Sequence, residues 1–326
     1  MHRYSLCVNI IKLERYTMAK VFIDGSAGTT GLRIYERLAV RRDIELIALG
    51  GELRKDKNAR RDALNAADVA FLCLPDAAAV DAADMVYNAE TVIIDTSTAH
   101  RTDDNWIYGF PELRGYRDAI AASKRIANPG CHASGFIALV EPLVSCGVIG
   151  ADAELSCFSL TGYSGGGKQM IAEYEAAENA EKLAAPRLYG LSQSHKHLPE
   201  MVKLCALKKA PAFCPIVSSY YSGMEVAVTL FGDMTDGGAD RIKSVYREYY
   251  TGKIVRFKEA ADEGGFMSAG AFSGRDDMEI SVYGNGERIT LIARFDNLGK
   301  GASGAAIQNM NIALGVDETA GLNIGG

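Results

Sequence analysis

Short apolar runs alternate with segments of helical spacing through the first third of the chain. Residues Ala19 to Asp24 form a run of strand type, and similar runs follow at 44–49, 69–74 and 91–95. Between the first two runs, apolar residues recur at the three- and four-residue spacing of an amphipathic helix. Alternating strands and helices predict a doubly wound parallel sheet of the Rossmann type, in an α/β fold.

The second half of the chain has a different pattern. Apolar runs of strand type occupy 155–161, 221–230, 278–283 and 289–295, and Gly284-Asn285-Gly286 separates the last two as a hairpin turn. A helix of small residues follows and ends near Met310. We therefore expect an α+β domain on a mixed or antiparallel sheet, with the last helix returning to the first domain.

These patterns divide the chain into three parts. The predicted nucleotide-binding domain consists of residues 18–127 and 301–326, and the predicted catalytic, substrate and oligomerisation domain of residues 128–300. Residues 1–17 fit neither part, and the apolar stretch within them is too short for a secretory signal. They are interpreted as an N-terminal extension or a misassigned start, with Met18 as the functional first residue.

A glycine turn joins the first predicted strand to the first predicted helix. Its residues are Gly25, Ser26, Ala27, Gly28, Thr29, Thr30 and Gly31. A tight turn before a helix N-terminus suits a dinucleotide pyrophosphate, although the spacing is G-x-x-G-x-x-G rather than G-x-G-x-x-G. The alternative is a turn that only packs helix on strand, and the alternating context favours cofactor binding. The third strand ends at Pro75, at the same predicted edge.

The end of the second predicted strand bears on the choice of cofactor. Glu52 could accept the ribose hydroxyls of NAD, whereas Arg54 and Lys55 could neutralise the 2'-phosphate of NADP. The basic pair favours NADP. A solvated basic loop is the alternative.

Composition excludes several other classes of protein. Of the 326 residues, 48% are hydrophobic and 23% are charged, and the net charge of −6 lacks the basic excess of a sequence-independent nucleic-acid binder. No apolar run approaches the ~20 residues that span a bilayer. The seven cysteines are odd in number and have no C-x-x-C spacing, which argues against a disulfide framework or a thiolate zinc site. Free thiols indicate a reducing, cytoplasmic compartment.

One cysteine stands where chemistry is possible. Cys131 follows Asn128-Pro129-Gly130 and precedes a long apolar helix. At a helix N-terminus, unpaired N–H groups and the helix dipole stabilise a thiolate and an oxyanion on a bound carbonyl. The alternative is a cysteine that merely fits a tight turn.

A thiol nucleophile needs a partner for its proton. His132 is adjacent, but neighbours on a helix do not face each other. His195 and His197 alternate around Lys196 and would point to one side of an extended segment. A metal site is the alternative, but a lone H-x-H without a third ligand is a weak pattern, so no metal is expected.

Two further clusters suit anions. The segment from Gly162 to Lys168 nearly matches the nucleotide P-loop, but Gln169 replaces the hydroxyl that would hold magnesium. A nucleotide triphosphatase is therefore rejected, and Lys168 could instead face an acidic substrate. Arg101 follows the fourth predicted strand and could bind a phosphate or carboxylate, or be an exposed structural arginine.

Several separated blocks together resemble the short-form (type 2) N-acetyl-gamma-glutamyl-phosphate reductase family of arginine biosynthesis. The resemblance covers about Met18 to Leu314. The blocks are Gly25–Gly31, Asp95-Thr-Ser-Thr-Ala-His-Arg101, Tyr108-Gly-Phe-Pro-Glu-Leu113, Asn128-Pro-Gly-Cys131, Gly162-Tyr-Ser-Gly-Gly-Gly-Lys168, His195-Lys-His197-Leu-Pro-Glu200 and Asn297 to Met310. The chain departs from the family after the cysteine, where His132-Ala133-Ser134 replaces the usual Tyr-Pro-Thr.

The resemblance implies a set of roles and an assembly. Cys131 would be the nucleophile, with His197 and His195 as acid/base and substrate-contacting groups. The substrate would be bound by Arg101, Ser97, Lys168 and Gly162. The glycine turn, Arg54, Lys55, Pro75 and Asn297 would bind NADP. The fold would be similar to the glyceraldehyde-phosphate and aspartate-semialdehyde dehydrogenases, assembled as a homodimer or homotetramer.

The implied reaction is NADPH-dependent reduction of N-acetyl-gamma-glutamyl phosphate. The Cys131 thiolate would attack the acyl phosphate and form a thioester, which accepts hydride, and a histidine would protonate the resulting oxygen. Two alternatives stay open. One is the reduction of another acyl phosphate, such as aspartyl or carrier-bound aminoadipyl phosphate, and the other is a non-catalytic NADP-binding sensor.

Overall fold

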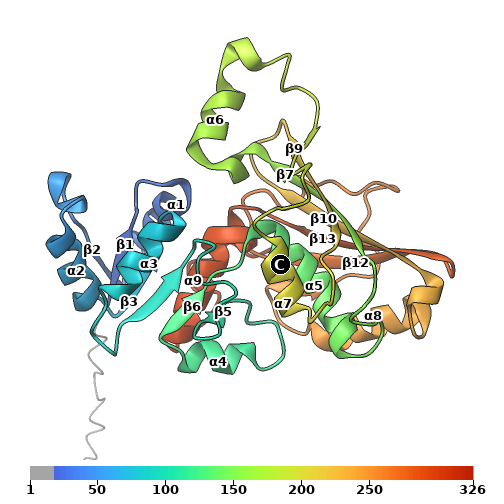
Figure 1. Ribbon diagram of the computed structural model, residues 1–326, viewed down its shortest axis with the longest axis horizontal. Helices are drawn as coiled ribbons and strands as arrows, with labels where there is room; N and C mark the ends of the chain where they lie inside the picture. Colours follow the sequence, from blue (N-terminus) through green and yellow to red (C-terminus); the bar gives the residue numbers. More distant parts are fainter. Residues whose placement is uncertain (1–17, 326) are drawn as a thin grey trace, which may run out of the picture.

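Two β-sheets organise the chain, and each is covered by helices (Figure 1). The computed structural model describes residues 18–325, so the predicted N-terminal extension lies outside the described residues. The α/β class predicted from the sequence is confirmed.

The first sheet has six strands in the order β2-β1-β3-β4-β6-β5, all parallel. Its strands are β1 (Ala19–Asp24), β2 (Ile44–Ile47), β3 (Val69–Leu72), β4 (Val92–Asp95), β5 (Ile107–Tyr108) and β6 (Arg125–Ala127). The carboxyl ends of parallel strands share one edge, so the segments that follow β1, β3, β4 and β6 meet there. These segments contain the glycine turn, Arg101 and Cys131.

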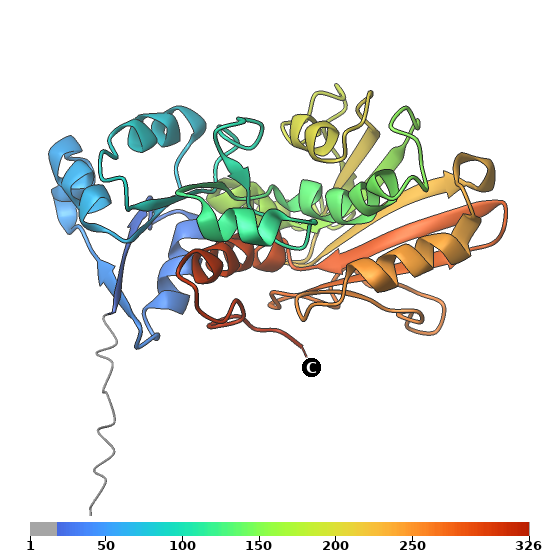
Figure 2. The same ribbon diagram turned by 90° about the horizontal axis from the view of Figure 1, so that it is seen from below.

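Helices cover both faces of this sheet because its strands are apolar on both sides. One face packs against α1 (Thr29–Leu38), α4 (Tyr116–Ala122) and α9 (Gly304–Ala313). The other face packs against α2 (Lys57–Ala66) and α3 (Asp76–Asp84). Helix α9 follows the last strand of the second sheet and returns to the first, as the sequence predicted (Figure 2).

The second sheet is mixed and has seven strands in the order β11-β12-β13-β10-β7-β9-β8. They are β7 (Ser156–Gly162), β8 (Arg187–Leu188), β9 (Ala212–Ser218), β10 (Met224–Phe231), β11 (Val255–Phe257), β12 (Met278–Gly284) and β13 (Arg288–Phe295). Helices α5 (Cys131–Ser145), α7 (Leu198–Leu204) and α8 (Gly238–Tyr249) lie against one face and share its apolar core. The hairpin predicted around Asn285 is confirmed as the β12–β13 connection.

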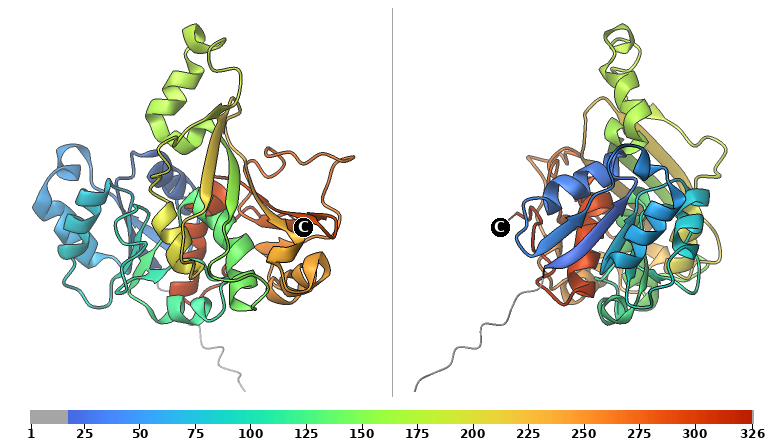
Figure 3. Two further views of the ribbon diagram at one scale, coloured as in Figure 1. Left: turned by 45° about the vertical axis from the view of Figure 1, so that its right-hand side comes forward. Right: turned by 90° about the vertical axis from the view of Figure 1, so that its left-hand side faces the viewer.

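An arm, defined here as residues 163–193, projects from the second sheet (Figure 3). It carries α6 (Gly167–Glu175) and β8, and its glycine-rich start folds as a short 3₁₀-helix, Tyr163–Gly166. The arm leaves the sheet beside the edge where the first sheet's strands end. It therefore lies near both the glycine turn and Cys131.

Three predicted strand boundaries are wrong by two or three residues. The third predicted strand ends at Leu72 rather than residue 74. The second predicted strand ends at Ile47 rather than residue 49, because the chain turns at Gly51, whose φ of +49° starts a 3₁₀-helix. The strand predicted from Tyr221 begins at Met224 instead. Gly223, at φ +122°, forms a turn whose backbone pairs with Gly162 and Asn297.

Candidate active site

Cys131 is the first residue of α5 and follows a turn that leaves strand β6. The turn begins with Asn128, whose N–H donates to the Asp95 carbonyl at the end of the neighbouring strand β4. Helix α5 is buried along almost its whole length, which fixes its first turn in place. The thiol lies on a pocket of about 380 Å³ between the two sheets.

Glycines let the chain close tightly around this turn. A Cβ on Gly130 would lie 2.5 Å from Nη1 of Arg101 and 2.6 Å from Nε2 of His197. A Cβ on Gly301 would lie 2.9 Å from the Cβ of Cys131. Gly301 belongs to a π-helix, Gly299–Ser303, that leads into α9. Such close approaches leave no room for another residue at either position.

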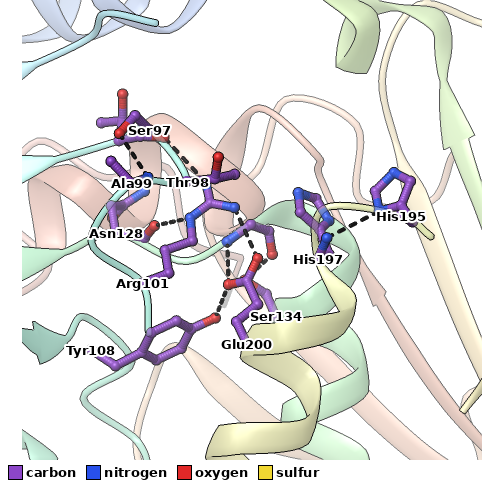
Figure 4. Close-up of polar contacts among 12 residues, drawn as sticks. Ser97, Thr98, Ala99, Arg101, Tyr108, Asn128, Ser134, His195, His197 and Glu200 are labelled. Atoms are coloured by element: carbon purple, nitrogen blue, oxygen red, sulfur yellow. Dashed lines mark hydrogen bonds and ion pairs between the residues drawn. The ribbon is translucent and has the colours of Figure 1, made fainter. Parts of the chain in front are cut away.

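Glu200 joins three parts of the site (Figure 4). Its carboxylate accepts hydrogen bonds from Nη1 of Arg101 at 2.8 Å, the Tyr108 hydroxyl at 2.6 Å and the Gly130 N–H at 3.1 Å. The side chain is 1% exposed, and three donors compensate its charge there. Glu200 thus ties helix α7 to the arginine and to the turn that carries the nucleophile.

Each of the three guanidinium nitrogens of Arg101 donates a hydrogen bond within the protein. Besides the ion pair with Glu200, Nε donates to the Asn128 carbonyl at 2.9 Å and Nη2 to the Thr96 carbonyl at 3.1 Å. The residue is 9% exposed and lines the pocket. Burial opposes its charge, but the Glu200 carboxylate leaves the pKa of Arg101 above its usual value. A fixed cation therefore faces any substrate that enters.

The two histidines of the predicted pair converge, although not as predicted. The segment is a turn rather than an extended strand, because Gln193 adopts φ +54° and His197 is helical at the start of α7. The backbone N–H of His197 donates to Nδ1 of His195 at 3.2 Å, and the ring centroids are 4.7 Å apart (Figure 4). Both rings line the pocket.

Burial decides the protonation of both histidines. It lowers the pKa of His195 to about 4, with Lys196 adding repulsion, and holds that of His197 well below its usual range. Both imidazoles are therefore neutral at pH 7. Nδ1 of His197 is buried and has no hydrogen-bond partner among residues 18–325.

His132 belongs to the pocket, contrary to what its position beside Cys131 suggested. Its Nδ1 is hydrogen-bonded to the Ser159 hydroxyl at 2.6 Å and its Nε2 to the Tyr189 hydroxyl at 2.7 Å. Its ring lies 5.6 Å from the rings of both His195 and His197. The adjacent residues Cys131 and His132 point in different directions, as expected, but the His132 ring lies beside the rings of His195 and His197.

The thiol of Cys131 is not the stabilised thiolate that the sequence suggested. Burial raises its pKa to about 11, and this outweighs the Arg101 charge and the N–H of His132, which both lower it. The resting group is therefore the neutral thiol. A nearby base has to take the proton when the sulfur reacts.

A second pocket of about 820 Å³ adjoins the glycine turn. Gly25 and Ser26 line it, and Gly25 has φ +87°, with no space for a Cβ against the Cys73 carbonyl. Basic side chains of Arg54 and Lys55 line the same pocket. The turn at the N-terminus of α1, the apolar walls and the cations together fit a dinucleotide phosphate.

An acid also lies in this second pocket, but it is paired. Asp24, at the end of β1, accepts from Nε and Nη2 of Arg60 at 2.8–3.2 Å. Its carboxylate is therefore neutralised by the protein. Arg54 is turned back by a hydrogen bond from its Nε to the Leu49 carbonyl at 2.9 Å.

The structure distributes the remaining predicted residues unevenly. Thr29, Thr30 and Asn297 line the first pocket, and Lys168 lines the second, away from the substrate position that was expected for it. The other predicted residues line neither pocket; they are Ser97, Gly162, Gly28, Gly31 and Pro75.

These residues have local structural contacts instead. The Ser97 hydroxyl donates to the buried carboxylate at the end of β4, and Gly162 packs against the backbone of the turn before β10. Gly28 and Pro75 are the N-caps of α1 and α3, and Gly31 packs in α1 against the backbone of the glycine turn. Within the described part of the chain, no three metal-ligating side chains gather, and no helix has the length and apolarity to cross a membrane.

Sequence reasoning missed four residues of the first pocket and its surroundings: Tyr108, His132, Tyr189 and Glu200. Glu200 and Tyr108 stand in blocks that were noted only as wholes. Tyr189 carries no local pattern, since it follows a two-residue strand in the arm. The sequence pattern that could have indicated Glu200 is a glutamate one helical turn after a histidine pair.

Comparison with known proteins gives a class that fits this fold and a reactive cysteine, the semialdehyde dehydrogenases. The NAD-binding domain of semialdehyde dehydrogenases matches residues 20–123, and their dimerisation domain matches residues 131–297. Among solved structures, aspartate semialdehyde dehydrogenase II from Vibrio cholerae, complexed with ASA, has a TM-score of 0.70 at 16% identity. It covers 91% of this chain and 98% of its own. The chain thus has the fold of the semialdehyde dehydrogenases.

Closer relatives narrow this class to one family. N-acetyl-gamma-glutamyl-phosphate reductase of Trichormus variabilis is 42% identical over 318 residues, covering 93% of this chain and 99% of the relative. The Brucella anthropi protein of the same name is 45% identical over 307 residues, covering 91% and 98%. The chain belongs to the N-acetyl-gamma-glutamyl-phosphate reductase family.

Proposed function

We propose that the chain reduces N-acetyl-gamma-glutamyl phosphate to N-acetylglutamate semialdehyde and phosphate, with NADPH as reductant, in arginine biosynthesis. One observation carries the proposal at the level of the site. A single pocket gathers a cysteine at a helix N-terminus, a fixed arginine and two neutral histidines, and a dinucleotide-type pocket adjoins it.

Covalent capture begins at Cys131. Its neutral thiol gives up its proton as Sγ attacks the acyl carbon, the C–S bond forms, and phosphate leaves with the electrons of the C–O bond. His197 is neutral because burial lowers its pKa, so it can accept that proton. We assign the base to His197 and the orienting contact to His195, whose Nδ1 accepts the His197 backbone N–H.

The same groups serve the second half of the reaction. Backbone N–H groups at the start of α5 stabilise the oxyanion that forms when the thioester is reduced. The proton held on the histidine returns to Sγ when the C–S bond breaks and the aldehyde departs. Arg101 holds an anionic group of the substrate throughout, since Glu200 and two carbonyls fix its direction.

The second pocket is the proposed site of NADP, which supplies the hydride when bound. Gly25 and Ser26 would receive the pyrophosphate, and Arg54 and Lys55 the 2'-phosphate. A solved aspartate semialdehyde dehydrogenase from Candida albicans, described with NADP, has a TM-score of 0.65 to this chain at 16% identity. Residues 18–127 with 301–326 would form the NADP-binding domain, and residues 128–300 the catalytic one.

The match to a dimerisation domain supports self-association through residues of the second sheet. We propose a homodimer or homotetramer in the cytoplasm. Size-exclusion chromatography with light scattering tests the assembly. A monomer at micromolar concentration would contradict it.

The direct test runs the reaction backward, because acyl phosphates are unstable. Purified protein is mixed with NADP, N-acetylglutamate semialdehyde and inorganic phosphate, and nicotinamide reduction is followed by absorbance. Phosphate-dependent reduction is the expected result. Activity with aspartate semialdehyde alone would change the substrate, and silence with both despite NADP binding would favour the sensor.

A variant separates the chemistry from cofactor binding. Cys131→Ser should bind NADP as the wild type does and lose turnover, because a hydroxyl is a far weaker nucleophile here. Cys214→Ser, at a strand position outside both pockets, is the matched control. Substantial activity in Cys131→Ser would contradict the thioester.

A further inference from the structure

One chain of hydrogen bonds in the first pocket is not used by the proposed chemistry. It runs from Ser159 on β7 through His132 to the Tyr189 hydroxyl in the arm, with contacts of 2.6 and 2.7 Å. Ser159 is 0% and His132 2% exposed, so the chain is anchored in the core. Tyr189 lines the pocket at its other end.

This chain gives the pocket a neutral polar group. Both nitrogens of the His132 ring face hydroxyls, and a neutral imidazole donates through one nitrogen and accepts through the other. In either tautomer the Tyr189 hydroxyl keeps one hydrogen-bonding function for the pocket, a proton in one case and a lone pair in the other. Burial lowers the pKa of His132 to about 3, which keeps the ring uncharged.

The pocket therefore combines this neutral group with two cations, Arg101 and Lys196, which both line it. Gly130 brings Arg101 beside His197. Beyond His197 lie the rings of His132, His195 and Tyr189, with centroid separations of 4.7–6.1 Å between neighbours. In Figure 4 the His195 ring lies farther from the Arg101–Glu200 ion pair than the His197 ring does.

Among the described residues, no aspartate or glutamate lines this pocket. Glu200 lies behind its wall, and both its oxygens are occupied by Arg101, Tyr108 and Gly130. An amino-acid substrate with a free α-ammonium group would lose water there without gaining a counter-charge. An acylated nitrogen carries no charge, and its amide offers both a donor and an acceptor.

We propose that Tyr189, held by His132 and Ser159, is a specificity-determining residue that hydrogen-bonds the acetamido group of the substrate. The wall around it has no carboxylate and includes the cation Lys196, so it rejects substrates with a free α-ammonium group. This rests on the proposed function and names the part of the site that selects N-acylated substrates. It also gives His132 a role, as the group that holds the Tyr189 hydroxyl.

The test compares N-acetylglutamate semialdehyde with 5-oxopentanoate, which has the same aldehyde and carboxylate but no acetamido group. Phosphate-dependent oxidation is measured for both. Tyr189→Phe should lower the ratio of the two kcat/KM values by about tenfold, since one hydrogen bond to the acetamido group is lost. The control Tyr87→Phe, on a side chain that is 76% exposed, should leave the ratio unchanged.

A second variant guards against a folding defect. Ser159→Ala removes the far anchor and should lower the same ratio by less. In the wild type, N-acetylaspartate semialdehyde should react better than aspartate semialdehyde, its free-amine counterpart of equal length. An unchanged ratio in both variants, whether or not activity on both substrates falls, or equal use of the free amine would overturn the proposal.

Failure of the proposed function would look different. A wild-type protein that oxidises neither acetylated aldehyde in the presence of phosphate would overturn that function and this inference together. A wild type that turns over N-acetylglutamate semialdehyde, with a Tyr189→Phe variant of unchanged selectivity, would overturn the inference alone.

Discussion

Replacing Glu200 by glutamine should be far more costly than its small change in shape suggests. The carboxylate is the acceptor for Arg101, Tyr108 and Gly130 and is 1% exposed. The glutamine amide would keep one acceptor oxygen but present an N–H₂ group to a donor, and the 9% exposed Arg101 would lose its counter-charge. Breaking a buried ion pair from one side costs about 3–5 kcal/mol, and the retained oxygen places the cost of Glu200→Gln at about 3 kcal/mol.

Urea unfolding followed by fluorescence and circular dichroism, at fixed protein concentration, measures this loss. The matched control is Glu90→Gln, because Glu90 pairs with Lys124 at 3.2 Å on the surface, where the pair contributes below about 1 kcal/mol. A double variant, Glu200→Gln with Arg101→Met, should be less destabilised than the sum of the single variants, since no unpaired cation remains. A loss for Glu200→Gln as small as that for Glu90→Gln would refute the reasoning.

Three further outcomes are expected. Gly31→Ala should lower the free energy of unfolding by about 1–3 kcal/mol, because the added Cβ would lie 2.5 Å from a backbone oxygen. The control Gly28→Ala should lower it by less than about 1 kcal/mol, since a Cβ there has more room. Thermal unfolding measures both, and equal losses would contradict the packing argument. Lys168→Gln should weaken NADP binding, measured by calorimetry, about fivefold, whereas the control Lys182→Gln should leave it unchanged. A rise in the KM for the aldehyde without weaker NADP binding would instead show that Lys168 contacts the substrate. The rate at which iodoacetamide alkylates Cys131, followed by peptide mass spectrometry, should keep rising above pH 9. The raised pKa of about 11 keeps the thiol protonated at lower pH. A rate that reaches a plateau by pH 8 would contradict the raised pKa.

The fold was predictable because its evidence is local. Each strand of the first sheet is a short apolar run, and the run from Ala19 to Asp24 is strand β1 to the residue. Two boundaries failed where a glycine at positive φ, Gly51 or Gly223, ends an apolar run early or delays its pairing. Such turns depend on backbone angles that residue patterns indicate only weakly.

The site was predictable only in part because its contacts are distant in sequence. Cys131 and the histidine pair have local patterns, and the structure places them on one pocket. The hydrogen bond between Tyr108 and Glu200 spans 92 residues, and that between His132 and Tyr189 spans 57. The thiolate expectation failed because burial, which raises the pKa, was invisible in the sequence.

The glycine-rich start of the arm touches both pockets. Gly165, Gly166 and Gly167 line the pocket of Cys131, and the next residue, Lys168, lines the pocket of the glycine turn. If the dinucleotide orders this segment, the two ligands share one coupling free energy. If the bound dinucleotide raises the affinity for the acyl phosphate by some factor, the bound acyl phosphate raises the affinity for the dinucleotide by the same factor. Such a coupling would pass through four consecutive residues of the backbone, and it would be the same whichever ligand binds first.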